Sequence, residues 1–243
     1  MNETIALLQK HRSIRSFKSL PIPEEHILAA VASGQMASSS SNIQSYCLIR
    51  ITDPRKRQTL VELTGGQPKV AESGAFFVVC GDTRRHRLMC EKHGKKYDAK
   101  LEAFLLAVVD ATLFAQNLVL AFESLGYGIC FIGGLRNNLP ESGSLLEIPT
   151  GVYPFYGLCV GSPDHEPPLR PRLPLEAVYF EDRYPPDDVV LGRLEAYDMA
   201  IREFEGDRGE GRSSWIQRMA EKFSRPERGE IAAYYRSQGA DLS

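Results

Sequence analysis

The longest apolar stretch of the chain, from Leu101 to Phe122, constrains the fold more than any other feature. Its only strongly polar residues are Glu102, Asp110, Gln116 and Asn117. A helix of this length could cross a membrane, but the carboxylates and amides inside it favour a buried helix of a soluble protein. A helix that is apolar on every side also needs cover on every side. The stretch therefore predicts a helix at or near the interface of a homodimer.

Charge and cysteine usage exclude several classes of protein. The 243 residues carry a formal net charge of −2, which argues against nucleic acid as the main partner. Charged and polar residues interrupt the N-terminus from Asn2 to Ser16, so we expect no signal peptide. The cysteines are odd in number and form no C-x-x-C pair: Cys47, Cys80, Cys90, Cys130 and Cys159. With histidines that lack metal-ligand spacing, they indicate a cytoplasmic protein with reduced thiols, no membrane span and no metal site.

Segments of helical and strand character follow one another along the chain. Apolar runs predict strands over residues 46–51, 75–80 and 153–160, and a short strand that leads into Phe131. Capping residues and helix breakers predict helices over 24–31, 55–63, 187–204, 214–223 and 229–238, and a short helix that ends at 145–148. Residues 67–69 are expected to form a polar loop, and residues 206–212 a mobile one.

Near the N-terminus, His11-Arg12-Ser13-Ile14-Arg15 places two guanidinium groups, an imidazole and a hydroxyl within five residues. Guanidinium forks are shaped for phosphate or carboxylate groups. If Ile14 and Phe17 point inward, Arg12, Ser13 and Arg15 are held together at a groove. The alternative is a solvated basic turn, so the motif gains meaning only if other segments complete a phosphate site.

Three further segments have the chemistry of a ligand site. The serine run Ser38–Ser41 enters a strand, which predicts an ordered loop that faces something polar rather than a linker. Gly133 and Gly134 follow a strand and would let a ligand approach bare backbone, although a plain turn has the same pattern. Arg170 and Arg172 alternate with prolines, so they either present a second fixed pair of guanidiniums or belong to a basic linker. No G-x-G-x-x-G, P-loop or G-x-S-x-G motif is present.

Taken together, these segments resemble the oxygen-insensitive nitroreductase A and flavin reductase P group of the nitroreductase family. The resemblance runs from the N-terminus to about Pro174 and continues more weakly to the end. It rests on the segments above and on Leu63-Thr64-Gly65-Gly66-Gln67, Ala115-Gln116-Asn117 and Ile132-Gly133-Gly134-Leu135-Arg136-Asn137.

The resemblance implies an α+β nitroreductase fold. A central mixed sheet is flanked by helices, and the homodimer is intertwined, with one FMN per subunit bound at its interface. The chain is expected to be one nitroreductase-like domain, with an FMN-binding core over 1–174 and a C-terminal helical extension and lid loop over 175–243.

The resemblance also assigns roles to single residues. The FMN phosphate and the pyrimidine edge of the ring would be held by His11, Arg12, Ser13 and Arg15, together with Arg170 and Arg172. The partner subunit would supply Ser39, Ser40 and Ser41. Gln67 and Lys69 would reach the ring or the ribityl chain, and Phe131, Ile132, Gly133 and Gly134 would lie along the ring. Where family members often have Lys-Pro-Arg, this chain has Arg170-Pro171-Arg172, which changes the donor geometry.

The implied activity is an FMN-dependent NAD(P)H oxidoreductase. Its partners would be a nicotinamide nucleotide and a small-molecule acceptor, namely a nitroaromatic compound, a quinone or free flavin, reduced in a ping-pong cycle without an essential catalytic residue. NADPH is expected to be preferred to NADH through Arg208, with Arg212 as the second candidate. The alternatives are a specialised enzyme of the same fold, such as a dehalogenase or a flavin-consuming synthase, and a non-catalytic flavin-binding or anion-binding protein.

Overall fold

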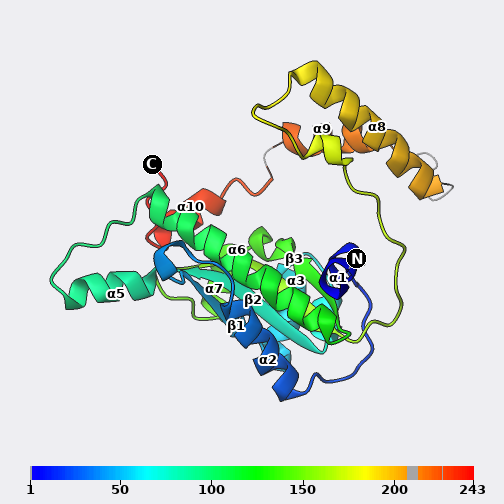
Figure 1. Cartoon of the computed structure of the whole chain (residues 1–243). Helices are drawn as coiled ribbons and strands as arrows, with labels where there is room; N and C mark the ends of the chain where they lie inside the picture. The colour runs from blue at the N-terminus through cyan, green and yellow to red at the C-terminus, as the bar shows by residue number, and fades with distance from the viewer. Residues whose placement is uncertain (1, 207–212, 226) are drawn as a thin grey trace. The chain divides into compact units, whose positions relative to one another are not determined.

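The computed structural model describes residues 2–206, 213–225 and 227–243 (Figure 1). The chain separates into two compact units, one made of Met1–Pro167 with Glu230–Ser243 and the other of Pro168–Gly229. This grouping differs from the expected division into 1–174 and 175–243. The last segment returns to the first unit because Tyr234 and Tyr235 are buried in its core.

The first unit is built on a four-stranded sheet with the order β1-β2-β4-β3. Its strands are β1 (Tyr46–Arg50), β2 (Ala75–Asp82), β3 (Gly128–Ile132) and β4 (Val152–Gly161). All three neighbouring pairs are antiparallel. The expectation of a mixed sheet is therefore corrected. Within the described residues, the parallel component is one isolated bridge between Ser13 and Ile129.

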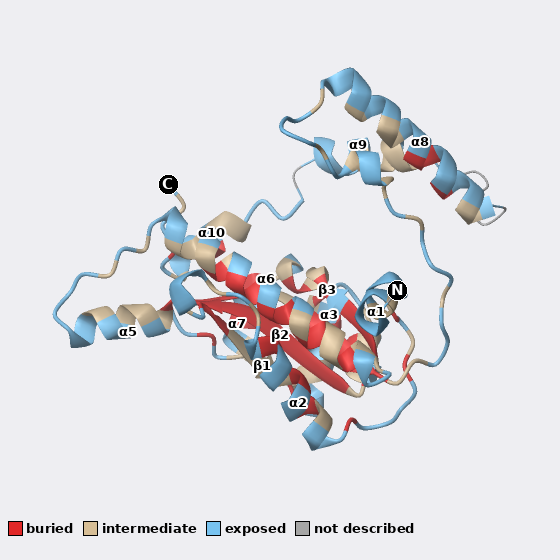
Figure 2. Cartoon of the chain, in the orientation of Figure 1, coloured by how far each residue is buried: buried red, intermediate tan, exposed pale blue. Residues whose placement is uncertain are grey.

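Helices cover both faces of the sheet, as predicted (Figure 1). Successive residues of β2 point to opposite faces, so Phe77 and Val79 pack toward α6 (Leu101–Ser124) and α2 (Glu24–Gln35). Phe76 and Val78 belong to the core on the other face, beneath α3 (Pro54–Leu63) and α4 (Lys69–Glu72). Both cores meet on β2, which is buried along its whole length (Figure 2).

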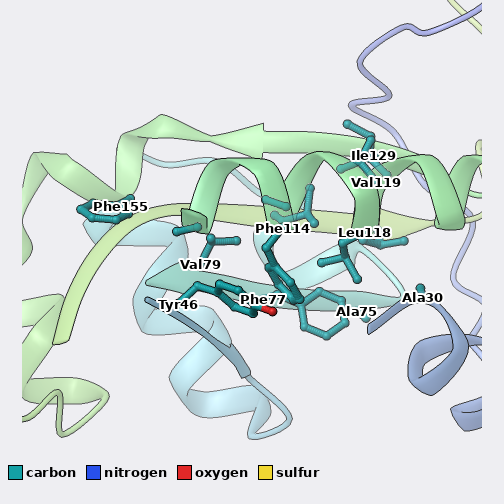
Figure 3. Close-up of a cluster of buried hydrophobic side chains, with 14 of the residues drawn as sticks. Ala30, Tyr46, Ala75, Phe77, Val79, Phe114, Leu118, Val119, Ile129 and Phe155 are labelled. Carbon is teal, nitrogen blue, oxygen red and sulfur yellow. The ribbon is translucent and has the colours of Figure 1, made fainter. Parts of the chain in front are cut away.

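Helix α6 presents two different faces. One face is buried and packs Phe114, Leu118 and Val119 over the sheet (Figure 3). On the other face the apolar side chains Leu101, Leu105, Val109 and Leu113 recur every four residues and are 39–52% exposed. The helix is long and apolar enough to cross a membrane by length and composition, and its buried face forms the centre of the core on this side of the sheet.

Several of the remaining elements match predicted segments with small shifts, but the helix over Arg84–Lys92 was not predicted. The first unit also contains α1 (Glu3–Gln9), η1 (Ser40–Asn42), α5 (Arg84–Lys92), η2 (Gly133–Asn137), α7 (Leu139–Leu145) and α10 (Ile231–Ser237). Helix α7 ends at Leu145, within the predicted range of 145–148, and Glu147 has a positive φ of 54°, which a helix does not accommodate. Lys69, expected in a loop, begins α4.

The second unit contains η3 (Leu175–Ala177), α8 (Asp187–Glu205) and α9 (Trp215–Ser224). Helix α9 begins with a capping box in which Ser214 and Gln217 exchange hydrogen bonds. Trp215 packs edge-on against Tyr197 of α8 at 4.9 Å between ring centroids. The Tyr197 hydroxyl donates a hydrogen bond to the Pro171 carbonyl at 3.1 Å, which joins the proline-rich segment to α8.

Candidate flavin site

The basic segment His11–Arg15 lies beside the outer edge of β3. The backbone N–H of Ile14 donates to the Ile129 carbonyl at 2.8 Å, next to the bridge between Ser13 and Ile129. The side chain of Ile14 is only 3% exposed and fills the space that Gly128 leaves open, since a Cβ on Gly128 would lie 2.4 Å from it. Phe17 is buried as well, so both anchors point inward as the sequence predicts.

The three basic side chains of this segment have different surroundings. The Nδ1 atom of His11 lies 2.6 Å from Oε1 of Glu123. Arg12 forms an ion pair with Glu166 at 3.1 Å and donates to the Pro167 carbonyl at 3.2 Å. Both side chains line a small cavity of about 200 Å³ whose walls include those two carboxylates. An anion would meet repulsion there, so the exposed Arg15 is the guanidinium of this segment best placed for a phosphate.

Two segments far apart in sequence meet at the end of β3. A Cβ added to Gly134 would lie 2.4 Å from the Thr64 carbonyl oxygen and 2.5 Å from Nε2 of Gln67. Gln67 is held in place because its Nε2 donates to the same carbonyl at 2.8 Å. The predicted residues Gln67 and Gly134 therefore form one surface, and only glycine fits at position 134.

Phe131 and Ile132 stand before the glycine pair at the end of β3. The ring of Phe131 is 39% exposed and packs edge-on against Tyr156 at 5.3 Å between centroids. Ile132 is fully buried and holds the strand end in the core. The surface is therefore an exposed aromatic ring followed by a glycine turn on a rigid strand.

Positive charge gathers around the buried cysteine of β3. Burial raises the pKa of the Cys130 thiol, while the charges of Arg15 and Lys69 act in the opposite direction. The carbonyl of Lys69 accepts a hydrogen bond from the Cys159 thiol at 3.4 Å, which fixes the start of α4 against β4. Arg15 and Lys69 thus approach the same part of β3 from different segments.

The serine run forms an ordered turn held by a buried carboxylate. Oγ of Ser39 donates to Oδ2 of Asp110 at 2.8 Å, and the backbone N–H of Ser45 donates to the same oxygen at 2.9 Å. Ser40 and Ser41 lie in η1 and are exposed. Ser41 has a φ of 48°, so the turn bends sharply there.

The serine run lies at the opposite end of the sheet from the basic segment. Ser13 is at the level of Ile129, which pairs with Val160 of β4. Ser45 accepts a hydrogen bond from Asp82, which pairs with Val152 at the start of β4. From Val152 to Val160 the strand rises about 26 Å. One copy of the chain therefore does not bring its own serines to its own basic segment.

Of the remaining predicted residues, two are in the second unit and two are outside the described residues. Arg170 and Arg172 are exposed in the second unit, where Tyr197 binds the carbonyl of Pro171 between them. Arg208 and Arg212 lie outside the described residues.

The structure also identifies three residues that sequence reasoning did not assign. Asp110 holds the serine turn, Glu123 binds His11, and Arg136 donates to the Phe155 carbonyl at 2.7 Å beneath Gly133. A lone carboxylate within an apolar helix was a usable signal for Asp110. Arg136 follows the glycine turn directly, but nothing in its sequence context distinguishes it from a surface arginine.

The described residues have two further features, one that concerns metal-binding groups and one that concerns a cavity. They contain no group of three His, Cys, Asp or Glu side chains that could hold a metal ion. A cavity of about 640 Å³ opens between α7 and α10, but none of the predicted flavin residues lines it.

Comparison with known proteins gives a consistent result. Residues 8–162 match the family described as "Nitroreductase family", and residues 170–243 match "Nitroreductase family, C-terminal domain". The chain is 41% identical to the "Oxygen-insensitive NADPH nitroreductase" of Salmonella typhimurium, over 98% of each chain. It is 38% identical to the "FMN reductase (NADPH)" of Bacillus subtilis, again over 98% of each. The solved structure of the NADPH:FMN oxidoreductase from Vibrio harveyi, complexed with NAD+, is 34% identical with a TM-score of 0.90, over 98% of this chain and 99% of that one.

Proposed function

Because the chain belongs to the nitroreductase family, we propose that it is an FMN-dependent NAD(P)H oxidoreductase. It would reduce nitroaromatic compounds, quinones or free flavin by two electrons in a ping-pong cycle. The observation that carries this proposal is the end of β3, where Gly134 packs closely against Gln67 and the exposed ring of Phe131 stands just before the glycine pair in the chain. The printed names of the Salmonella and Bacillus relatives support the same activity.

The residues present at this surface fit a flavin mononucleotide. Gly133 and Gly134 open the 3₁₀ helix η2, and the opening N–H groups of a helix have no acceptor within it. They would face a ring lying along Phe131. Arg15 and Ser13 would bind the phosphate, and Gln67 and Lys69 the polar edge of the ring.

A second copy of the chain is needed to complete this arrangement. The serine turn lies about 26 Å along the sheet from Ser13 in the same chain, so serines that reach the same flavin would come from a partner. The exposed apolar face of α6 supports the same conclusion, because a contiguous apolar stripe marks an interaction surface. We therefore propose a homodimer with two flavin sites at its interface.

When bound, FMN would accept a hydride from the nicotinamide and pass electrons to the second substrate. The chain's own contribution is binding and electrostatics. Arg15 and Lys69 bring positive charge to this part of β3, which favours a flavin that carries negative charge. No catalytic acid or base is assigned.

The nicotinamide is proposed to be NADPH, since NADPH appears in the printed names of the Salmonella and Bacillus relatives. The acceptor is proposed to be a small molecule and the location to be the cytoplasm, with neither nucleic acid nor a membrane as partner. Reduced cysteines without C-x-x-C spacing support this location.

The test begins with the purified protein, which should be yellow and carry about one FMN per chain. NADPH added under nitrogen should bleach it, and a nitroaromatic compound or quinone should restore the colour. Colourless protein that takes up no flavin would refute the proposal. Flavin that NADPH does not reduce would instead indicate a non-catalytic flavin-binding protein.

Replacement of single arginines tests the binding residues. Arg15→Ala and Arg172→Ala should each weaken FMN binding, because a hydrogen bond to a charged group contributes roughly 1.5–3 kcal/mol. The matched control is Arg55→Ala, an exposed arginine of α3 with no proposed flavin contact. Equal affinity in all three variants and the unmodified chain would refute the assigned roles.

A further inference from the structure

Two cysteines lie directly opposite each other in the sheet. Cys47 of β1 and Cys80 of β2 are partners in the antiparallel ladder, so their side chains project from the same face. The N–H of Asp82 donates to the Ser45 carbonyl at 2.9 Å, which marks that pair as hydrogen-bonded. Hydrogen-bonded and non-hydrogen-bonded pairs alternate along an antiparallel ladder. Cys47 and Cys80 are two positions further on, so they also form a hydrogen-bonded pair. The Cα atoms of such a pair are about 5.5 Å apart. Disulfides span this Cα separation.

We propose that Cys47 and Cys80 form a reversible intramolecular disulfide when the protein meets a peroxide. The site is separate from the flavin surface, and none of the predicted flavin residues belongs to the pair. It lies on the side of the sheet that packs against α3 and α4.

The two thiols differ in a way that assigns their roles. Cys47 is half-buried, whereas Cys80 is fully buried. A hydrogen bond from the Cys80 thiol lowers the pKa of Cys47, and Arg85 acts in the same direction against burial and Asp82. The same interaction and burial raise the pKa of Cys80. The thiolate is the nucleophile of cysteine chemistry, so Cys47 attacks first and Cys80 resolves.

The chemistry balances in two steps. The Cys47 thiolate attacks one oxygen of hydrogen peroxide, the O–O bond breaks, and a sulfenic acid forms while hydroxide leaves and is protonated to water. The Cys80 thiol then attacks the Cys47 sulfur, the S–O bond breaks, and its proton leaves with the hydroxyl group as a second water. Peroxide is reduced by two electrons, and the two thiols are oxidised by two.

A second pair of cysteines in the same sheet can be compared with Cys47 and Cys80. Cys130 of β3 and Cys159 of β4 are also direct ladder partners. In this second pair the Cys159 thiol donates to the Lys69 carbonyl at 3.4 Å and the Cys130 thiol to the Phe131 carbonyl at 3.7 Å, whereas the Cys80 thiol of the first pair makes a longer contact of 4.0 Å to the Val78 carbonyl. Burial raises the pKa of Cys159 to about 12 and also raises that of Cys130. This pair is buried and protonated, and it should stay reduced.

The experiment uses the purified full-length protein with its cofactor. After hydrogen peroxide treatment, free thiols are alkylated in denaturant and the intact mass is measured. The product should lose the mass of two hydrogen atoms and two of its five alkylatable thiols, and dithiothreitol should restore both. Trypsin should then release residues 19–50 joined to residues 70–84, because each peptide contains one of the two cysteines.

Cysteine variants distinguish a disulfide between Cys47 and Cys80 from other oxidation products. Cys47→Ser should keep its four remaining thiols alkylatable after peroxide, and Cys80→Ala should accumulate a sulfenic acid on Cys47 that dimedone traps. Cys90→Ser is the matched control and should form the same disulfide as the unmodified chain. Three results would each overturn the proposal. They are the absence of the joined peptide in the unmodified protein, a disulfide between Cys130 and Cys159 instead, and a disulfide between two chains.

Discussion

The Asp110 carboxylate, in the middle of the apolar helix α6, accepts a hydrogen bond from the Ser39 hydroxyl at 2.8 Å. Asp110 is 1% exposed, and its Oδ2 atom also binds the backbone of Ser45 at the entrance of β1. A buried charge is costly unless hydrogen bonds compensate it, so the serine turn and α6 stabilise each other. The conformation of the proposed partner-facing loop therefore depends on a residue of the core helix.

Asp110→Asn should test this dependence. The amide keeps one acceptor but loses the charge that strengthens both hydrogen bonds, so the free energy of unfolding should fall by about 1–3 kcal/mol. FMN affinity should fall as well if the serines reach the partner's flavin. Urea unfolding and flavin titration measure the two effects, with the exposed Glu102→Gln of the same helix as control. An unchanged stability would show that the carboxylate is not needed.

Gly134→Ala should damage the flavin surface. The new Cβ would lie 2.4 Å from the Thr64 carbonyl oxygen, so the turn or Gln67 must move, at a cost of about 1–3 kcal/mol. Flavin affinity and thermal stability should both fall. Gly192→Ala is the control, because it has open space in the interior of α8 and should raise helix stability by up to about 1 kcal/mol. Normal flavin binding by Gly134→Ala would contradict the close packing.

The apolar face of α6 should hold the dimer together. Light scattering should give twice the chain mass of 27.1 kDa. Leu105→Asp places a charge within the stripe and should produce monomers that lose FMN, because burying an unpaired charge in an interface is costly. Leu88→Asp on α5 is the control, since Leu88 and Leu105 are both 47% exposed. A stable monomer of the unmodified chain that retains FMN would refute the dimer.

Alkaline pH should destabilise the first unit through α10. Burial raises the pKa of Tyr234 from 10.0 to about 12. Between these two pH values the unfolded chain loses the phenolic proton while the folded chain keeps it. The contribution of Tyr234 to the free energy of unfolding is therefore fully present below pH 10, and above pH 10 it falls by roughly 1.4 kcal/mol per pH unit. Burial also raises the pKa of Tyr235, whose hydroxyl donates to the Pro154 carbonyl at 2.8 Å, and adds to the same fall.

Urea unfolding at about pH 8 and about pH 11 measures this effect, and Tyr234→Phe should lessen the fall because it removes the titrating group. The same variant should keep its stability at the lower pH, since the described residues offer the Tyr234 hydroxyl no hydrogen-bond partner. At the lower pH, the free energy of unfolding of Tyr235→Phe should be about 1 kcal/mol smaller, because this variant lacks the hydrogen bond of the Tyr235 hydroxyl. Equal slopes in all three proteins would contradict the assignment.

NADPH should be preferred to NADH, with Arg208 contributing most of the preference. A guanidinium that binds the 2′-phosphate would give a ratio of kcat/KM of roughly ten- to a hundredfold. Arg208→Ala should reduce this ratio strongly and Arg212→Ala less, while Arg225→Ala serves as a control from the same unit. Equal use of both coenzymes by the unmodified chain would refute the preference.

Local sequence determined the elements of this protein and the chemistry of its site. Helix starts, helix breakers and apolar runs predicted the helices and strands. Examples are Glu24–Glu25, Gly65–Gly66 and the apolar run of β2. The glycine pair at 133–134 was recognisable from its place after a strand, although the packing against Thr64 that requires glycine at 134 is tertiary. These features depend on neighbours within a few residues, so the sequence alone contains them.

The tertiary structure decided which of these segments meet. Strand register places Ser13 and Ser45 at opposite ends of the sheet, and it sets Cys47 against Cys80. It also replaced the expected mixed sheet with an antiparallel one. Register and helix packing arise from contacts between residues far apart in sequence, where one residue of slip moves a side chain to the other face. No local pattern in a single sequence specifies such pairings, because their free energy is a property of the assembled core.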